Sequence, residues 1–145
     1  MPEVVVVGVD GSEAGERAAT FAVSHMSDPG STVLVAYVIP WSPFTLQTAE
    51  ENARRATEKD REIKEAQEHV IDPLLAKLAE HGPATVEGVV RHGHPAETLC
   101  NIAEERGADH VLVGRIGQSR VRALLFGSTP GNLIQISTVP VTVVP

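Results

Sequence analysis

The chain has 145 residues, 42% of them apolar and 21% charged, which is the composition of an ordinary globular protein, and we expect one compact domain over residues 1–145. Its single cysteine, Cys100, excludes a disulfide framework, and the apolar run from Val4 to Val9 is too short for a signal peptide or a membrane span, so we expect a cytoplasmic protein without membrane insertion. A net charge of −7, with three lysines and five aromatic residues, argues against nucleic acid as a partner.

Charge is unevenly distributed along the chain. Residues 1–109 carry nine basic and nineteen acidic side chains, whereas residues 110–145 carry Arg115, Arg120 and Arg122 and no acidic residue. An acid-free, basic tail in an acidic protein is a candidate site for an anionic ligand.

The first forty residues predict a strand, a helix and a second strand. Residues 4–10 (VVVVGVD) form a β-branched run that ends in a turn, which is typical of a strand buried on both faces. Ser12 is positioned to cap a helix that runs from Glu13 to about Met26. Its apolar positions recur at helical spacing and are expected to face the core: Ala14, Ala18, Phe21, Ala22 and His25. Residues 32–39 (TVLVAYVI) predict the second buried strand.

Residues 49–81 predict a long surface helix, because Ala, Glu, Arg and Lys dominate this stretch. One face carries the larger apolar residues: Ile63, Ala66, Val70, Leu74 and Leu78. Within it, Asp72-Pro73 indicates a kink or a restarted helix, since proline has no N–H for a helix interior.

The remaining residues predict further alternation of strands and helices. We expect a strand over 85–91, a loop over 92–95, a helix over 96–106 capped by Gly107, a strand over 110–113, a helix over 130–137 and a last strand over 139–144. Five strands that alternate with helices predict an α/β fold: a five-stranded, doubly wound parallel sheet with helices on both faces, as in Rossmann-like proteins.

In such a sheet, ligands bind beyond the carboxyl ends of the strands, at the point where the strand order reverses. Asp10 follows the first strand, and the stretch after the fourth strand is rich in glycine and hydroxyl residues that could surround an anion: Gly114, Gly117, Gly127, Ser128 and Thr129. No Gly-Lys-Ser/Thr motif occurs, and Gly-x-Gly-x-x-Gly is missing after the first strand, so the ordinary NTPase and dinucleotide sites are not indicated.

The spacing Gly-x-x-Gly-x9-Gly-Ser at the fourth strand, together with VGVDGS at the first strand and the closing VPVTVVP, resembles the universal stress protein family in its single-domain, nucleotide-binding branch. By that resemblance, Asp10 and Val38 flank the adenine and the ribose, and Val9 and Val113 belong to the same wall. The resemblance further implies that the glycines, Ser128 and Thr129 hold the ribose and the phosphates. Arg115 is a candidate for additional phosphate contact.

We therefore expect an adenine-nucleotide-binding protein with a regulatory role in a stress response, with ATP as the ligand and Mg²⁺ reaching the site through the phosphates. Two departures from the family pattern, Gly8 and Pro130, leave AMP and cyclic AMP open, because proline has no N–H to donate to a phosphate. Little or no hydrolysis is expected, since no carboxylate follows Asp109 to position water or metal. A weak ATPase and a dimeric adaptor without nucleotide remain the alternatives.

Other reactive residue types receive structural interpretations. His92 and His94 flank Gly93 but lack a third metal ligand at a suitable spacing, so a surface loop is expected there. Cys100 falls on the apolar face of its helix and is read as a core residue. No catalytic or metal-binding residue is assigned.

The last strand predicts the assembly. Residues 139–145 (VPVTVVP) are strongly β-branched and nearly devoid of polar side chains, so this strand would be prone to pairing if it formed an exposed sheet edge. Pairing with a second copy about a two-fold axis satisfies such an edge. We expect a homodimer whose contact includes Val141 and Val143, which the family resemblance also implies.

Overall fold

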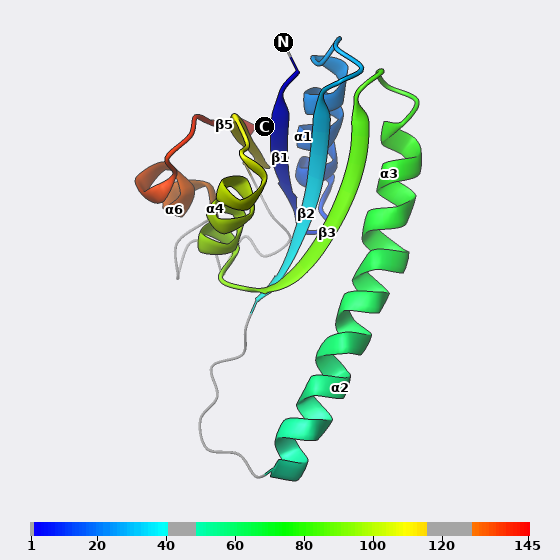
Figure 1. Cartoon of the computed structure of the whole chain (residues 1–145), viewed down its shortest axis with the longest axis vertical. Coiled ribbons are helices and arrows are strands. Elements are labelled where there is room, and N and C mark those ends of the chain that lie inside the picture. The colour runs from blue at the N-terminus through cyan, green and yellow to red at the C-terminus, as the bar shows by residue number, and fades with distance from the viewer. Residues whose placement is uncertain (1, 41–48, 116–128) are drawn as a thin grey trace.

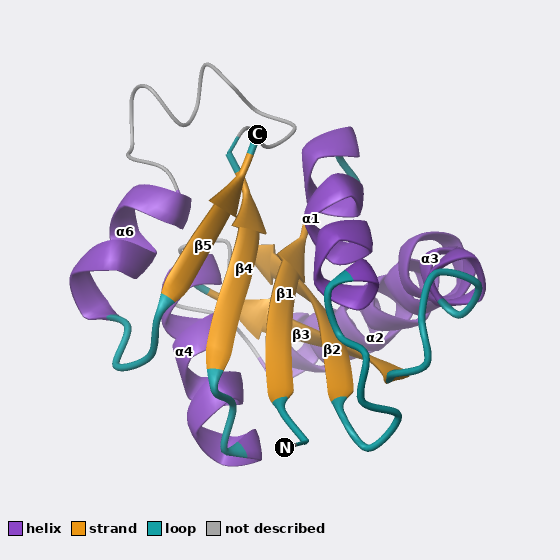
Figure 2. Ribbon diagram, turned by 90° about the horizontal axis from the view of Figure 1, so that it is seen from above, coloured by secondary structure: helices purple, strands orange, loops and turns teal. Residues whose placement is uncertain are grey.

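The structure is a computed structural model that describes residues 2–40, 49–115 and 129–145. Its five strands, all parallel, form one sheet: β1 (Val4–Val9), β2 (Thr32–Pro40), β3 (Thr85–Gly93), β4 (His110–Gly114) and β5 (Val141–Val144). The strand order is β3-β2-β1-β4-β5, so β1 is central and the direction of the winding reverses beside it (Figures 1 and 2). The predicted α/β fold is confirmed.

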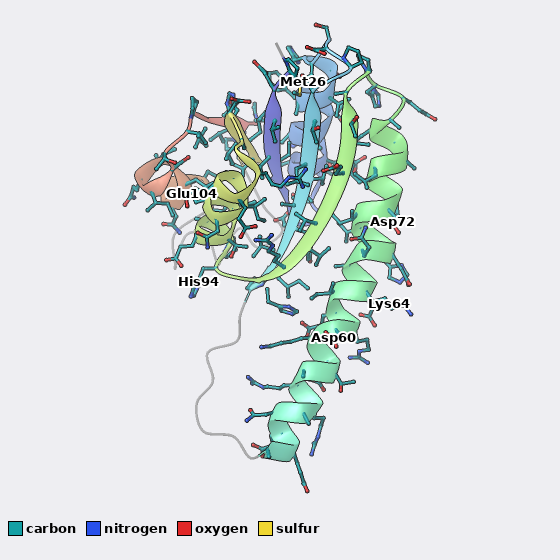
Figure 3. The ribbon with its side chains drawn as sticks, viewed as in Figure 1. Met26, Asp60, Lys64, Asp72, His94 and Glu104 are labelled. Atoms are coloured by element: carbon teal, nitrogen blue, oxygen red, sulfur yellow. The ribbon has the colours of Figure 1, made fainter. Side chains whose placement is uncertain are left out.

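Helices cover both faces of the sheet (Figure 2). One face carries α1 (Glu13–Ser24), the π-helical segment η1 (Gln67–Ile71) and α3 (Asp72–Leu78), and the other carries α4 (Pro95–Arg106) and α6 (Thr129–Ile136). Helix α2 (Ala49–Ala66) continues into η1 and extends beyond the strands, so that Asp60 lies clear of the sheet (Figure 3).

Each strand divides its side chains between two hydrophobic cores. Val5, Val7 and Val9 of β1 pack with α1 and α3, whereas Val6 packs with α4. A strand that is buried on both faces must avoid polar side chains at every position, which explains the four consecutive valines Val4–Val7 of β1. The same alternation holds in β2, where Val33 and Val35 face one core and Leu34 and Ala36 face the other.

The predicted helix caps are present. Ser12 is extended (φ −83°, ψ 160°) and its Oγ accepts a hydrogen bond from Gly15 N at 3.2 Å, which begins α1. Gly107 ends α4 in the left-handed conformation at φ 61°. Both ends therefore follow from local residue chemistry.

The predicted restart of the long helix at Asp72-Pro73 is observed, but the π-helical segment before it was not predicted. Helix α2 ends at Ala66, five π-helical residues follow, and α3 starts at Asp72 with Pro73 in its first turn. The N–H of Asp72 donates to the carbonyl of Gln67, five residues earlier. Pro73 supplies no N–H to the carbonyl of His69, so the α-helical pattern cannot run through this point.

One prediction of burial and two predictions of strand boundaries need correction. Phe21 and His25 do not face the core: both are exposed, Phe21 by 40%, and their rings stack with centroids 4.0 Å apart. Strand β3 continues through His92 and Gly93, which were expected in a loop, because these residues pair with Ile39 and Pro40 of the long strand β2. Strand β5 begins at Val141 rather than at residue 139.

The two edges of the sheet differ in character. Strand β3 carries charged residues on one face, where Glu87 pairs with Arg106 and Arg91 pairs with Glu105. Strand β5 carries no charge and leaves Val143 37% exposed. Charged residues on an edge strand oppose pairing with a strand of another chain. Strand β5 lacks such charges and is therefore the edge that is better suited to pair with another chain. Within the described residues, no helix is both long and apolar enough to cross a membrane.

Candidate functional site

The winding of the sheet reverses between β1 and β4, and this places the predicted site at their carboxyl ends. Gly8 is paired with Val113, so Asp10 follows β1 beside the point where Gly114 ends β4. A Cβ at Gly114 would lie 2.6 Å from the carbonyl carbon of Ala14 and 2.8 Å from its oxygen. Glycine at 114 therefore lets the first turn of α1 pack closely against the end of β4.

Asp10 is fixed by the turn that follows it. Its Oδ1 accepts a hydrogen bond from Ser12 N at 3.0 Å, and Gly11 adopts φ 83°, a conformation that favours glycine. The carboxylate is partly exposed. Asp10 therefore combines a structural role in the turn with a position at the carboxyl edge of the sheet.

The three valines predicted for one wall lie on opposite faces of the sheet. Val9 belongs to the core beneath α1 and α3, whereas Val38 and Val113 belong to the core beneath α4 and α6. Their exposed fractions are 7%, 9% and 4%, so each side chain is largely enclosed by protein. The structure brings Asp10 and Gly114 to one edge, and it places Val9 on the opposite face of the sheet from Val38 and Val113.

The proposed anion cradle is described in part. Arg115 is exposed, and its backbone N–H donates to the carbonyl of Val144 at 2.7 Å, which extends the pairing of β4 with β5. Thr129 begins α6 and is partly exposed. The remaining predicted residues of the cradle lie outside the described residues: Gly117, Gly127 and Ser128, as do Arg120 and Arg122.

A cleft beside the loop after β1 was missed by the sequence analysis. It has a volume of about 170 Å³ and is lined by residues of that loop, of α1, of η1 and of α3: Val9, Gly11, Ser12, Glu16, His69, Val70, Pro73, Leu74 and Lys77. We call it the α1–α3 cleft. The only sequence signal for it was Asp72-Pro73, which marks where the helical pattern changes.

The two histidines that flank Gly93 are positioned by different elements. His92 lies in β3 with its side chain 10% exposed, and its Nε2 is 2.7 Å from Glu62 Oε2 of α2. His94 is exposed and stands at the N-terminus of α4 (Figure 3). Across residues 2–40, 49–115 and 129–145, no group of three His, Cys, Asp or Glu side chains could hold a metal ion.

Cys100 is half-buried on α4. Burial raises the pKa of its thiol above the ordinary value, and the nearby carboxylates of Glu104 and Glu97 raise it further. A thiol that stays protonated is a poor nucleophile, which agrees with its interpretation as a packing residue.

Comparison with known proteins agrees with this architecture. The model of the universal stress protein family matches residues 1–145. A universal stress protein of Mycobacterium tuberculosis is 31% identical over 147 residues, which cover 98% of this chain and 95% of the relative. One from Methanocaldococcus jannaschii is 29% identical over 140 residues, covering 97% and 80%.

Solved structures share the fold. UspA from Lactobacillus plantarum has a TM-score of 0.79 at 20% identity, covering 99% of this chain and 97% of that one. A universal stress protein in complex with cAMP has a TM-score of 0.68 at 24% identity, covering 99% and 96%. One from Archaeoglobus fulgidus in complex with dAMP has a TM-score of 0.64 at 20% identity, covering 100% and 98%. The sheet order, the residues at its carboxyl edge and the full-length family match together establish that this chain belongs to the universal stress protein family.

Proposed function

We propose that this chain is a regulatory protein that binds an adenine nucleotide, with ATP as the principal ligand, at the carboxyl ends of β1 and β4. The observation that carries the proposal is the meeting of Asp10 and Gly114 at the point where the winding reverses, next to the Gly-x-x-Gly-x9-Gly-Ser sequence. The complexes of two structural neighbours with cAMP and dAMP support the same ligand class.

The described residues fit a nucleotide. The Asp10 carboxylate can accept hydrogen bonds from ribose hydroxyls. Thr129 starts α6, where N–H groups without helical partners favour a phosphate. Mg²⁺ would be held by the phosphates rather than by a protein cluster. A role in a stress response follows from the family and is part of the proposal.

A nucleoside monophosphate, AMP or cyclic AMP, is the second candidate ligand. Pro130 occupies the first turn of α6 and has no N–H, so one potential phosphate donor is missing. The two neighbours named above were solved with monophosphates, which favours this alternative over a nucleotide-free adaptor.

Hydrolysis is proposed to be absent or slow. Asp10 is the carboxylate that directly follows β1 at the site, and the sequence has no acidic residue after Asp109. A competent phosphoryl-transfer site needs groups that orient water and hold the metal. Turnover with Mg²⁺ and ATP is therefore expected far below the range of about 1 to 10³ per second of typical enzymes. A rate within that range that is lost in Asp10→Asn would identify an ATPase instead.

The ligand can be identified directly. Freshly purified protein is denatured and any released nucleotide is identified by mass spectrometry, which gives the base and the phosphate number together. Gly117→Val and Gly127→Val are expected to abolish binding measured by calorimetry while the protein stays folded, because the added side chain blocks the phosphates. Gly107→Asn is the control, since asparagine tolerates the left-handed conformation at this distant helix end. Unchanged affinity in both valine variants would contradict the proposed cradle.

We also propose a homodimer that pairs β5 with β5. The strand is an uncharged sheet edge, and two exposed isoleucines of the adjacent α6, Ile134 at 67% and Ile136 at 46%, lie on the same side of the fold. Edge pairing about a two-fold axis would satisfy the free backbone groups of β5 and remove Val143 from water.

A further inference from the structure

The α1–α3 cleft lies over a different part of the sheet from the proposed nucleotide site. Helix α1 packs mainly on β1 and β4, whereas α3 packs on β3, so the gap between the two helices lies on the β2 side of α1. The proposed nucleotide site, where Asp10 and Gly114 meet, lies on the β4 side of β1. The cleft therefore adjoins that site through the turn of Gly11 and Ser12 but has walls of its own.

The cleft has the size of a site for one small molecule. Its volume of about 170 Å³ lies below the roughly 300 Å³ at which pockets begin to enclose drug-sized molecules. It therefore admits a molecule with a single ring and excludes a complete nucleotide.

The lining of the cleft combines an apolar wall with a rim of balanced charge. Val9 and Leu74, each 7% exposed, and the half-buried Val70 supply apolar surface. At the rim, Lys77 Nζ lies 3.1 Å from Glu16 Oε1, and these opposite charges leave little net charge toward a ligand. A charged ligand would be opposed by one member of the pair, whereas an uncharged hydroxyl can donate to the carboxylate or accept from the ammonium group.

The π-helical segment places two residues in the cleft. His69 and Val70 both belong to η1, and both line the cavity. Single π-helical turns within α-helices are rare and occur frequently at functional sites. The segment is held firmly against the sheet, because Ile71 is fully buried over Gly88 of β3. The unusual backbone therefore forms a fixed wall of the cleft.

We infer that the α1–α3 cleft is a second ligand site, which takes a small uncharged molecule with one ring and a hydroxyl group. The ring lies against Val70 and Leu74, and its hydroxyl group faces the pair Glu16–Lys77. The inference goes beyond the proposed binding of a nucleotide and does not depend on it, because none of these four residues belongs to the nucleotide site proposed above.

A titration with phenol tests the inference. Methyl NMR spectra of the wild-type protein are expected to show saturable shifts at Val70 and Leu74, with a Kd of the order of 1 mM, and none at Val143, which is exposed elsewhere. Val70→Trp fills the cavity and is expected to weaken phenol binding about tenfold or more. Glu68→Trp is the control, since it introduces the same side chain at an exposed position outside the lining and is expected to leave the affinity unchanged.

Charged relatives of phenol test the rim. Benzoate and benzylammonium are expected to bind the wild-type cleft more weakly than phenol. Glu16→Gln removes the carboxylate that Lys77 contacts and should strengthen benzoate by up to about fivefold, the effect of an exposed ion pair. Lys77→Met should strengthen benzylammonium in the same way. A wild-type protein that binds either charged molecule as tightly as phenol would overturn the assignment of an uncharged ligand.

Three other results would overturn the inference. They are the absence of saturable shifts at Val70 and Leu74 in the wild-type protein, an unchanged phenol affinity in folded Val70→Trp, and the loss of the shifts when ATP saturates the protein, which would make the cleft part of the nucleotide site. The wild-type shifts decide the case in which Val70→Trp does not fold. A protein that binds phenol in the cleft but binds no adenine nucleotide would overturn the proposed function alone.

Discussion

Gly88 and Ile71 are coupled in a way that mutation can measure. Gly88 lies on β3 and is paired with Val35, and Ile71 of η1 packs directly on it with no exposed surface. A Cβ at position 88 would overlap Ile71 Cγ2 and would lie 3.3 Å from Leu75 Cδ1. Gly88→Ala therefore forces the π-helical segment away from the sheet unless the isoleucine is shortened.

The expected free energies follow from this geometry. Gly88→Ala should lower the free energy of unfolding by about 1–3 kcal/mol, as overpacking does. Ile71→Ala should lower it by about 2–5 kcal/mol, because a fully buried side chain leaves a cavity. In the double variant the new Cβ would lie 3.6 Å from the retained Cβ of residue 71, an ordinary contact. The overlap is then gone, and the double variant should be about 1–3 kcal/mol more stable than the sum predicts.

Urea unfolding of the four proteins measures this coupling, with each kcal/mol also visible as about 2–4 °C in Tm. Gly107→Ala combined with Ile71→Ala is the control cycle. Gly107 ends α4 on the other face of the sheet, and a Cβ there meets no atom within 4 Å, so these two effects should add. Additivity within about 0.5 kcal/mol for Gly88 and Ile71 would refute the packing argument.

Three further predictions concern assembly, reactivity and pH. Replacing Val141 and Val143 together by Lys should convert the dimer to a monomer in light scattering, whereas a wild-type monomer at micromolar concentration or a dimeric variant would show that the interface lies elsewhere. Cys100, whose thiol pKa is raised by burial and two carboxylates, should react with iodoacetamide more slowly at pH 7 than free cysteine and accelerate at alkaline pH; faster reaction would contradict its assignment. The hydrogen bond from Arg91 lowers the pKa of Glu105, so this pair stabilises the fold above the ordinary glutamate pKa and loses its effect as the pH falls below it. Arg91→Met should therefore lower stability more at pH 7 than at pH 3 in urea unfolding, and an equal loss at both would argue against the ion pair.

The positions of the first two strands, and their burial on both faces, could be predicted from the sequence. Residues 4–7 are four valines and residues 33–39 are apolar throughout, and short β-branched runs of this kind that end in a turn are typical of strands buried on both faces. Ser12 and Gly107 marked their helix ends through side-chain capping and left-handed backbone, which are local properties. The carboxyl-edge position of Asp10 followed from topology.

Features that depend on tertiary contacts were not predictable. Phe21 is spaced from Ala14 and Ala18 as residues on one face of a helix are. This spacing does not show how much of the circumference of α1 the sheet covers, and Phe21 lies outside the covered part. The π-helical segment depends on Pro73 and on the packing of Ile71 against β3, which a periodicity argument does not contain. The α1–α3 cleft combines residues from positions 9 and 77, and nothing in the sequence between them indicates that they meet.

The pairing of β1 with β4 has a thermodynamic consequence. We call this pairing the β1–β4 seam. It joins residues far apart in the sequence: Val4 N donates to Asp109 Oδ2, 105 positions away. It also holds the segment that contains Asp10 next to the segment that contains Gly114. A molecule held by both residues binds only those chains in which the seam is closed. By linkage, its binding energy then opposes opening of the seam, so saturation with ligand should slow hydrogen exchange of the β1 and β4 amides more than that of β3.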